Sequence, residues 1–213
     1  MVGAMPPQLR FPGRPGVSLV SAVLLVVAVV ALVLAVALPI DQLTRSGGSV
    51  SVSPADLKGG DRTLDVTGLP EGVSVVDATA EAVLTASELP VGLRVLTELP
   101  DALTLAAVAI GAWLLGRALS TVHDGRPFDR RNPGRLAGLA AAVLLGGLVA
   151  PLTEGVVASA VLTHLDLVGP EGPFLAFETT LSFVPVGVAL ALTGAAEAFR
   201  RGRALEDELE GTV

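Results

Sequence analysis

Apolar residues in this chain gather into four long stretches, which shorter polar segments separate. The first stretch, residues 17–38, contains no charged residue, no Pro and no Gly, and it consists almost wholly of Val, Leu and Ala. Coiled as a helix it would reach roughly 33 Å, which is enough to cross the hydrocarbon core of a bilayer. The pattern therefore predicts an integral membrane protein whose first span lies at residues 17–38.

Three further spans are predicted at residues 101–122, 133–162 and 174–199. Asp101 suits the first turn of the second span, because a carboxylate favours the positive end of the helix dipole. Asn132 is read as an N-cap in front of Pro133, so the third span is expected to start there. The fourth span contains Pro185 and is expected to continue as a helix past Phe199 into the C-terminal tail.

The distribution of Arg predicts the orientation of these spans. Short segments rich in Lys or Arg stay on the cytoplasmic side of a membrane. Arginines occur in the N-terminal tail (1–16), in the turn at 123–132 and in the C-terminal tail (200–213), whereas the loop at 163–173 has no Lys or Arg. Both termini are therefore expected in the cytoplasm, with residues 39–100 and 163–173 outside.

The first outer loop, residues 39–100, is too long for a simple connector. Ser and Val alternate at 48–53, and polar residues alternate with Leu64 and Val66 at 62–67. After a Gly-Leu-Pro-Glu-Gly turn signal, an extended, β-branched pattern follows at 73–85. Such alternation predicts two or three short strands in a small antiparallel sheet. The expected fold is an all-α membrane protein with four transmembrane helices and a small extracytoplasmic β-rich insertion between the first two.

The first span also has a rival interpretation as a cleaved signal peptide. Ala35, Val36 and Ala37 form the small-x-small pattern of a cleavage site. The apolar core of a signal peptide is about 7–15 residues long, however, and this stretch is longer. We favour an uncleaved signal anchor.

Composition narrows the function classes. Hydrophobic residues make up 51% of the chain and charged residues 16%, and the net charge is −7. Direct nucleic-acid binding needs a clustered basic surface and is not expected. The chain has no Cys, and one Lys stands against thirteen Arg, a bias typical of a GC-rich bacterial coding sequence. The predicted location is the bacterial cytoplasmic membrane, with the lipid bilayer as the first partner.

No catalytic, metal or cofactor motif emerges from the sequence. The two histidines, His123 and His164, are expected on opposite sides of the membrane, so they cannot share a metal or form a catalytic pair. No Gly-rich loop follows a strand, and nothing resembles a nucleotide site. The sequence predicts a protein that is not an enzyme and that carries no cofactor.

Of the ionisable residues within the predicted spans, where the bilayer makes charge costly, Arg117, Glu154 and Glu197 are the candidate intramembrane polar residues. Glu154 follows Pro151 near the outer end of the third span, where it either marks a polar ion path or reaches water at the interface. Arg117 and Glu197 lie near the inner ends of the second and fourth spans. They are expected to pair with each other, the alternative being that each extends separately to the interface.

Small residues recur at four-residue spacing along the third span, a pattern that permits close helix packing. They are Gly134, Gly138, Ala142 and Gly146.

The turn at 123–132 carries a family resemblance. It reads His-Asp-Gly-Arg-Pro-Phe-Asp-Arg-Arg-Asn and is followed by Arg135 and Leu136. This segment, with the basic-to-acidic tail at 200–213, resembles the bacterial four-span family catalogued as domain of unknown function 2975. The resemblance covers roughly residue 96 to the C-terminus. It implies no established activity, and it implies a link to a small helix-turn-helix regulator, whose gene often lies beside those of the family.

The turn and the tail are therefore the predicted docking surface for a cytoplasmic protein. Gly125 permits a left-handed backbone and Pro127 restricts φ, so the turn is expected to be rigid. In the tail, Leu205 and Leu209 are four residues apart and share one face of a helix among acidic residues. The docking residues predicted from the turn and the tail are Gly125, Pro127, Phe128, Asn132, Leu205, Glu206, Glu208 and Leu209.

The leading function is a non-enzymatic sensor or regulatory component that docks a cytoplasmic partner, a helix-turn-helix regulator being the candidate that the resemblance implies. The alternative is a small transporter or channel subunit that uses Glu154 near Pro151. An intramembrane enzyme is disfavoured because paired catalytic groups are lacking.

Overall fold

The computed structural model describes residues 14–44, 50–52, 73–78, 81–86, 89–126, 128–168, 179 and 181–210. The tail at 1–13, the segment predicted as a strand at 62–67, Pro127, and residues 169–178 lie outside these ranges. Within them the chain is mostly helical. Three of its helical stretches, Ser18–Thr44, Val91–His123 and Asn132–His164, are long and apolar enough to cross a membrane.

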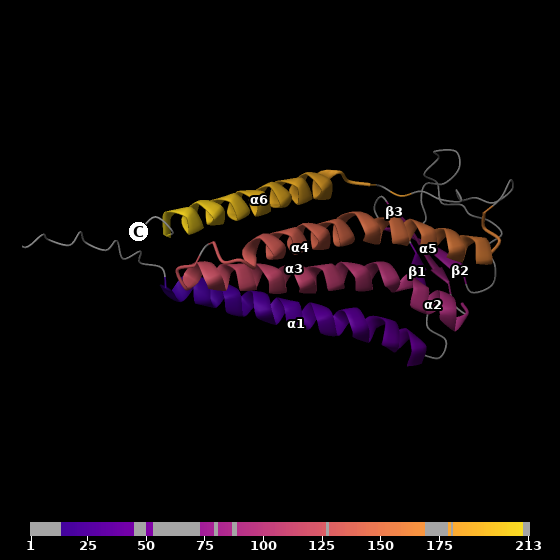
Figure 1. The fold of residues 1–213 in the computed structure, drawn as a ribbon. Coiled ribbons are helices and arrows are strands. Elements are labelled where there is room, and N and C mark those ends of the chain that lie inside the picture. Colours follow the sequence, from indigo (N-terminus) through magenta and orange to yellow (C-terminus); the bar gives the residue numbers. More distant parts are fainter. Residues whose placement is uncertain are drawn as a thin grey trace, which may run out of the picture.

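The long helices lie side by side in the order α1, α3, α4, α6 (Figure 1). Helix α1, Arg14–Thr44, packs on α3, Leu99–His123. The short helix α2, Val91–Thr97, comes directly before α3. Helix α4, Asn132–Leu144, continues through a π-helical segment η1, Leu145–Val149, into α5, Ala150–His164. Helix α6, Val184–Glu210, packs on α4.

Small residues allow α3 and α4 to approach closely. A Cβ added to Gly138 would lie 2.8 Å from the Leu114 Cδ1 atom, and one added to Gly146 would lie 3.0 Å from the Ala107 Cβ atom. Three members of the small-residue stripe predicted from sequence, Gly138, Ala142 and Gly146, thus face α3, whereas a Cβ on Gly134 would meet nothing within 4 Å. Larger side chains at these positions would push the two backbones apart.

Helix α6 begins later than predicted. The fourth span was expected to start at residue 174, but Thr179 and residues 181–183 are not helical and α6 starts at Val184. The Ser182 hydroxyl accepts a hydrogen bond from the Val184 N–H at 3.3 Å, and Pro185 occupies the first turn. Proline is tolerated there because the first N–H groups of a helix have no intrahelical partner, whereas it would interrupt a helix running through it. As predicted, the helix continues past Phe199, and it ends at Glu210.

A three-stranded antiparallel sheet lies between α1 and α2 in the sequence. Its strands are β1, Val50–Val52, β2, Val73–Ala78, and β3, Glu81–Ala86, in the order β1-β3-β2. Leu84 of the central strand pairs with Val52 on one side and with Val75 on the other. We call the end of the helix row beside this sheet the sheet end, and the opposite end, where α3 turns into α4, the turn end.

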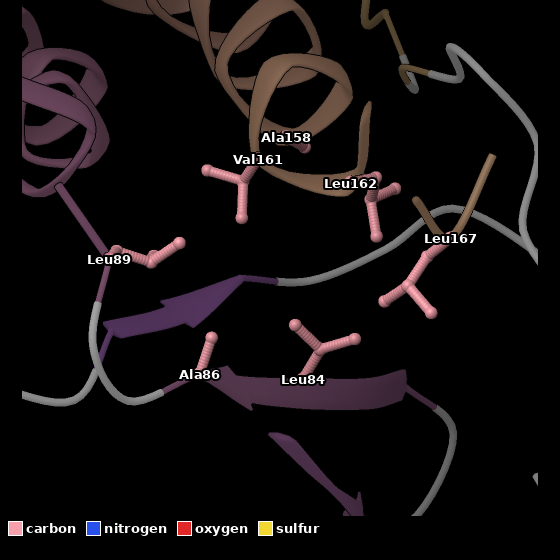
Figure 2. Packing of buried hydrophobic residues seen from close by; sticks show 7 residues of the cluster. All are labelled: Leu84, Ala86, Leu89, Ala158, Val161, Leu162 and Leu167. Carbon is pink, nitrogen blue, oxygen red and sulfur yellow. The ribbon is translucent and has the colours of Figure 1, made fainter. Parts of the chain in front are cut away.

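The largest apolar cluster among the described residues joins the sheet to α5. Leu84 and Ala86 of β3 face Ala158, Val161 and Leu162 of α5 (Figure 2). Leu84 and Val161 are completely buried, and Leu89 and Leu167 close the two sides of the cluster. Burial of such side chains stabilises by about 1.5–3 kcal/mol each, so this cluster fastens the small sheet to the long helix.

Candidate functional site

At the turn end, helix α3 ends in a Schellman motif. The Gly125 N–H donates to the Val122 carbonyl at 3.1 Å, and the Arg126 N–H donates to the Thr121 carbonyl at 2.9 Å. Gly125 has φ +76°, the left-handed conformation that this motif requires and that glycine adopts without steric cost. The sequence-based expectation of a left-handed backbone at Gly125 agrees with this geometry, and Gly125 itself is exposed.

Asn132 links two helices rather than capping one. Its side chain is 1% exposed, and its Oδ1 atom accepts hydrogen bonds from the Thr121 hydroxyl at 3.1 Å and from Arg135 Nη1 at 2.9 Å. The expected N-cap role is therefore wrong: α4 begins at Asn132, and Asp129 Oδ1 accepts the Arg131 N–H at 2.8 Å just before it. That hydrogen bond and the nearby arginines lower the pKa of Asp129. Asn132 is buried and makes these hydrogen bonds within the protein, so a docking partner cannot reach it.

Arg135, which is half-buried, completes this polar link. Its Nη1 atom donates to the Arg117 carbonyl at 2.8 Å as well as to Asn132. One guanidinium thus ties the first turn of α4 to the last turns of α3. Buried polar groups that satisfy one another in this way specify one arrangement of the two helices, since any shift would leave some of them unpaired.

Phe128 docks the turn onto α6. Its ring centroid lies 5.7 Å from that of Phe199 with the planes inclined at 55°, a tilted geometry that aromatic pairs favour. A Cβ added to Gly202 would lie 2.7 Å from the Phe128 Cε1 atom, so the Phe128 ring packs directly against Gly202. Arg203 Nη1 donates to the Phe128 carbonyl at 3.1 Å, and Arg203 Nη2 lies 3.3 Å from Asp207 Oδ1. We call Phe128, Phe199, Gly202 and Arg203 the latch.

The latch was not foreseen from sequence, although one signal pointed to it. Glycine inside a helix costs about 1 kcal/mol relative to alanine, so a glycine between Arg201 and Arg203 indicates close approach by another group. Phe128 was predicted as a docking residue for another protein. In the structure it is half-buried and contacts α6 of its own chain.

The predicted Arg117–Glu197 pair is wrong. Glu197 Oε1 lies 2.8 Å from Arg201 Nε and its Oε2 contacts Arg200, both on the same helix. The Arg117 guanidinium lies over the Trp113 ring, 5.6 Å from the centroid. Residues three or four apart on a helix are neighbours, so Glu197 and Arg117 each contact a side chain of their own helix. Helix α6 packs on α4 rather than on α3, which carries Arg117.

In the tail half of α6, residues 198–210, the side chains at 204–208 are exposed. Leu205 is 61% exposed, and Glu206 and Glu208 are exposed beside it. The backbone of Leu209 belongs to α6, whereas its side chain lies outside the described part of the structure. Of the predicted docking residues, Gly125, Leu205, Glu206 and Glu208 are accessible, whereas Phe128 and Asn132 serve internal contacts.

Glu154 is exposed on α5, nineteen residues beyond Arg135 on the same run of helix. That separation corresponds to about 28 Å, close to the thickness of a hydrocarbon core. Just before it, the chain is π-helical from Leu145 to Val149, and Thr179 Oγ1 donates to the Pro151 carbonyl at 3.1 Å. π-Helical turns often occur at functional sites.

His123 ends α3 and His164 ends α5, at the turn end and the sheet end respectively. Across the described ranges, no group of three or more His, Cys, Asp or Glu residues is placed to hold a metal ion.

Comparison of the chain with protein-family models, with curated proteins and with solved structures finds no match.

Proposed function

We propose that this chain is a non-enzymatic regulatory membrane protein that docks a cytoplasmic partner on the tail half of α6. The observation that carries the proposal is the continuity of α6. One uninterrupted helix, Val184–Glu210, begins with an apolar half against α4 and ends in an exposed, charged half. A rigid helix with this division can present a surface at a fixed distance from the membrane.

The proposal includes a fourth span formed by the apolar half of α6. Pro185 lies against Gly147 of η1 and Gly202 lies against Phe128, so α6 runs the length of α4. The seventeen residues between Pro185 and Gly202 correspond to about 26 Å of helix, slightly less than a typical hydrocarbon core. In this arrangement the turn end is cytoplasmic, and the sheet with α5 forms a β-rich insertion on the outer side of a bacterial cytoplasmic membrane.

The docking surface consists of Leu205, Glu206 and Glu208, with Leu209 on the same face by spacing. An exposed leucine among carboxylates suits a small basic protein that also presents an apolar side chain. The resemblance to domain of unknown function 2975 makes a helix-turn-helix regulator encoded beside this chain the first partner to test.

Binding of that purified regulator to the full chain in detergent tests the proposal. Leu205→Gln should weaken binding at least tenfold, whereas the matched control Ala204→Gln, one position away, should change it less than threefold. Removal of residues 204–213 should abolish binding without loss of the folded helices. Equal binding by the truncated and full chains would show that the tail is not the docking surface.

The orientation has its own test, because the chain contains no native cysteine. A membrane-impermeant thiol reagent applied to intact cells should label Ser74→Cys and should not label Asp124→Cys or Thr212→Cys. The reverse pattern would place the tail outside and remove the basis for cytoplasmic docking.

A second candidate, a small transporter or channel subunit, is favoured by the π-helical segment η1 and the adjacent Pro151. Proline has no N–H to donate, so backbone carbonyls in this region can turn toward a polar path. Ion flux into proteoliposomes that is lost in Glu154→Gln, with folding intact, would support this candidate. Equal flux with empty liposomes would exclude it for the ion tested.

A further inference from the structure

Five arginine side chains at the turn end are exposed. Arg126, Arg200 and Arg201 have side-chain exposures of 69%, 74% and 78%. Arg130 and Arg131 are exposed as well. Two neighbouring arginines behave differently, since Arg135 and Arg203 turn inward and donate to backbone carbonyls.

The latch holds the two chain segments that carry the exposed arginines at the same end of the molecule. Arg203 holds the Phe128 carbonyl at 3.1 Å, so the turn that carries Arg130 and Arg131 lies against the stretch of α6 that carries Arg200 and Arg201. Segments 117–135 and 197–203 together contain eight arginines and three carboxylates, a net charge of +5 with His neutral, in a chain whose net charge is −7. The positive charge is thus concentrated at the turn end.

The same face of α6 carries apolar groups next to these charges. Leu190 is 68% exposed and lies eleven residues before Arg201, which places the two side chains on one helix face three turns apart. Their axial separation is about 16 Å, close to half the thickness of a hydrocarbon core. An acyl chain lying against Leu190 would therefore end in a headgroup at the level of Arg201.

Glu197 lies on this face as well, and it already pairs with Arg200 and Arg201. Its carboxylate aligns the two guanidinium groups without occupying all their donors, because each guanidinium carries five N–H donors in a planar fork. Donors remain on each group for a phosphate oxygen, and guanidinium forks match phosphate geometry.

From this arrangement we infer that Arg200 and Arg201 bind the headgroup phosphate of an anionic phospholipid, while Arg130 and Arg131 of the adjoining turn add positive charge at the same end of the molecule. The lipid belongs to the leaflet at the turn end, and its acyl chains lie along the exposed apolar face of α6. The inference rests on the proposed fourth span, since α6 must lie in the bilayer for Leu190 to meet acyl chains.

Native mass spectrometry of the full chain in detergent, titrated with phosphatidylglycerol or phosphatidylcholine, tests the inference. The wild-type chain should retain phosphatidylglycerol at least tenfold more strongly. The double substitutions Arg200→Gln/Arg201→Gln and Arg130→Gln/Arg131→Gln should each lower this preference about tenfold, on the basis of the contribution expected from each basic residue at an anionic surface. The charge-preserving double variant Arg200→Lys/Arg201→Lys should lose less than threefold.

Equal retention of the two lipids, or unchanged preference in both Gln variants, would overturn the inference. Displacement of phosphatidylglycerol by millimolar inorganic phosphate would also overturn it, because the site would then bind a soluble anion. The chain truncated after Arg203 separates this inference from the docking proposal. It should keep its lipid preference while losing the regulator, so either activity can fail without the other.

Discussion

Helices α3 and α5 end in the same backbone motif at opposite ends of the molecule, with different residues at its critical position. At the turn end the left-handed residue is Gly125, with φ +76°, and at the sheet end it is Asp166, with φ +56°. In α5 the Asp166 N–H donates to the Thr163 carbonyl at 3.2 Å and the Leu167 N–H donates to the Leu162 carbonyl at 3.0 Å. These hydrogen bonds match those around Gly125. The steric cost differs, because the Cβ atom of Asp166 disfavours a left-handed backbone, whereas glycine has no Cβ atom.

The residues around Asp166 explain how the sheet end tolerates the steric cost of its left-handed backbone. Leu167, directly after Asp166, is 5% exposed and belongs to the cluster that joins β3 to α5. Burial of one leucine is worth about 1.5–3 kcal/mol, which is enough to offset the cost of about 1–3 kcal/mol for one strained residue. The turn end has no comparable apolar cluster among the described residues, and it relies on polar links and the latch. The two ends therefore differ in how they are held together, and substitutions can test this difference.

The largest effect is expected at the sheet end. Leu84→Ala removes a completely buried side chain from the cluster and should lower the free energy of unfolding by about 2–5 kcal/mol. Hydrogen exchange in detergent should show faster exchange in β3 and α5 while α3 and α4 near the turn keep their protection. Leu205→Ala, at a 61% exposed position, is the control and should change stability by less than about 0.5 kcal/mol. A uniform rise in exchange along all helices would show that the two ends unfold together.

At the turn end, Asn132→Ala should cost about 1–3 kcal/mol, because it removes the acceptor of both the Thr121 hydroxyl and Arg135. Asn132→Asp is the matched control, since it keeps an oxygen acceptor facing the Arg135 guanidinium and should recover most of the loss. Thermal unfolding of the purified variants in one detergent measures both. Similar losses in the two variants would mean that the shape of the amide, rather than its acceptor oxygen, secures the helix pair.

Local rules in the sequence predict the three long apolar helical stretches well and predict the contacts between helices poorly. The apolar run at 17–38 lies within α1, and Gly125 has the left-handed backbone that its residue type favours. The start of α6, the predicted fourth span, was placed ten residues too early. The apolar residues before Pro185 suggested an earlier start than the one that this proline marks. Arg117 and Glu197 both lie on the turn-end parts of their helices, yet no periodic pattern reveals which helices are neighbours in the row.

The latch permits a test in which the sign of the effect changes. Gly202→Ala in the wild-type chain places a Cβ 2.7 Å from the Phe128 ring, and the overpacking cost of about 1–3 kcal/mol should cancel or exceed the gain in helix propensity. In a Phe128→Ala background the ring is gone, so the same substitution should stabilise by up to about 1 kcal/mol. Gly194→Ala, where a Cβ meets nothing within 4 Å, should behave alike in both backgrounds. Equal effects of Gly202→Ala in the two backgrounds would mean that the Phe128 ring does not pack against Gly202.

The smallest effect is expected at the left-handed residues that end α5 and α3, Asp166 and Gly125. Asp166→Gly removes a Cβ from a left-handed position and should raise the free energy of unfolding by about 0.5 kcal/mol, after the greater freedom of glycine in the unfolded chain is deducted. The reciprocal variant, Gly125→Asp, should lower it by a similar amount, because the same motif then carries a Cβ at the turn end. Urea or thermal unfolding of both variants beside the wild type gives the two signs. If Asp166→Gly instead destabilises the protein, the Asp166 carboxylate must contribute more than its backbone strain costs. The sheet end would then depend on a polar contact as well as on its apolar cluster.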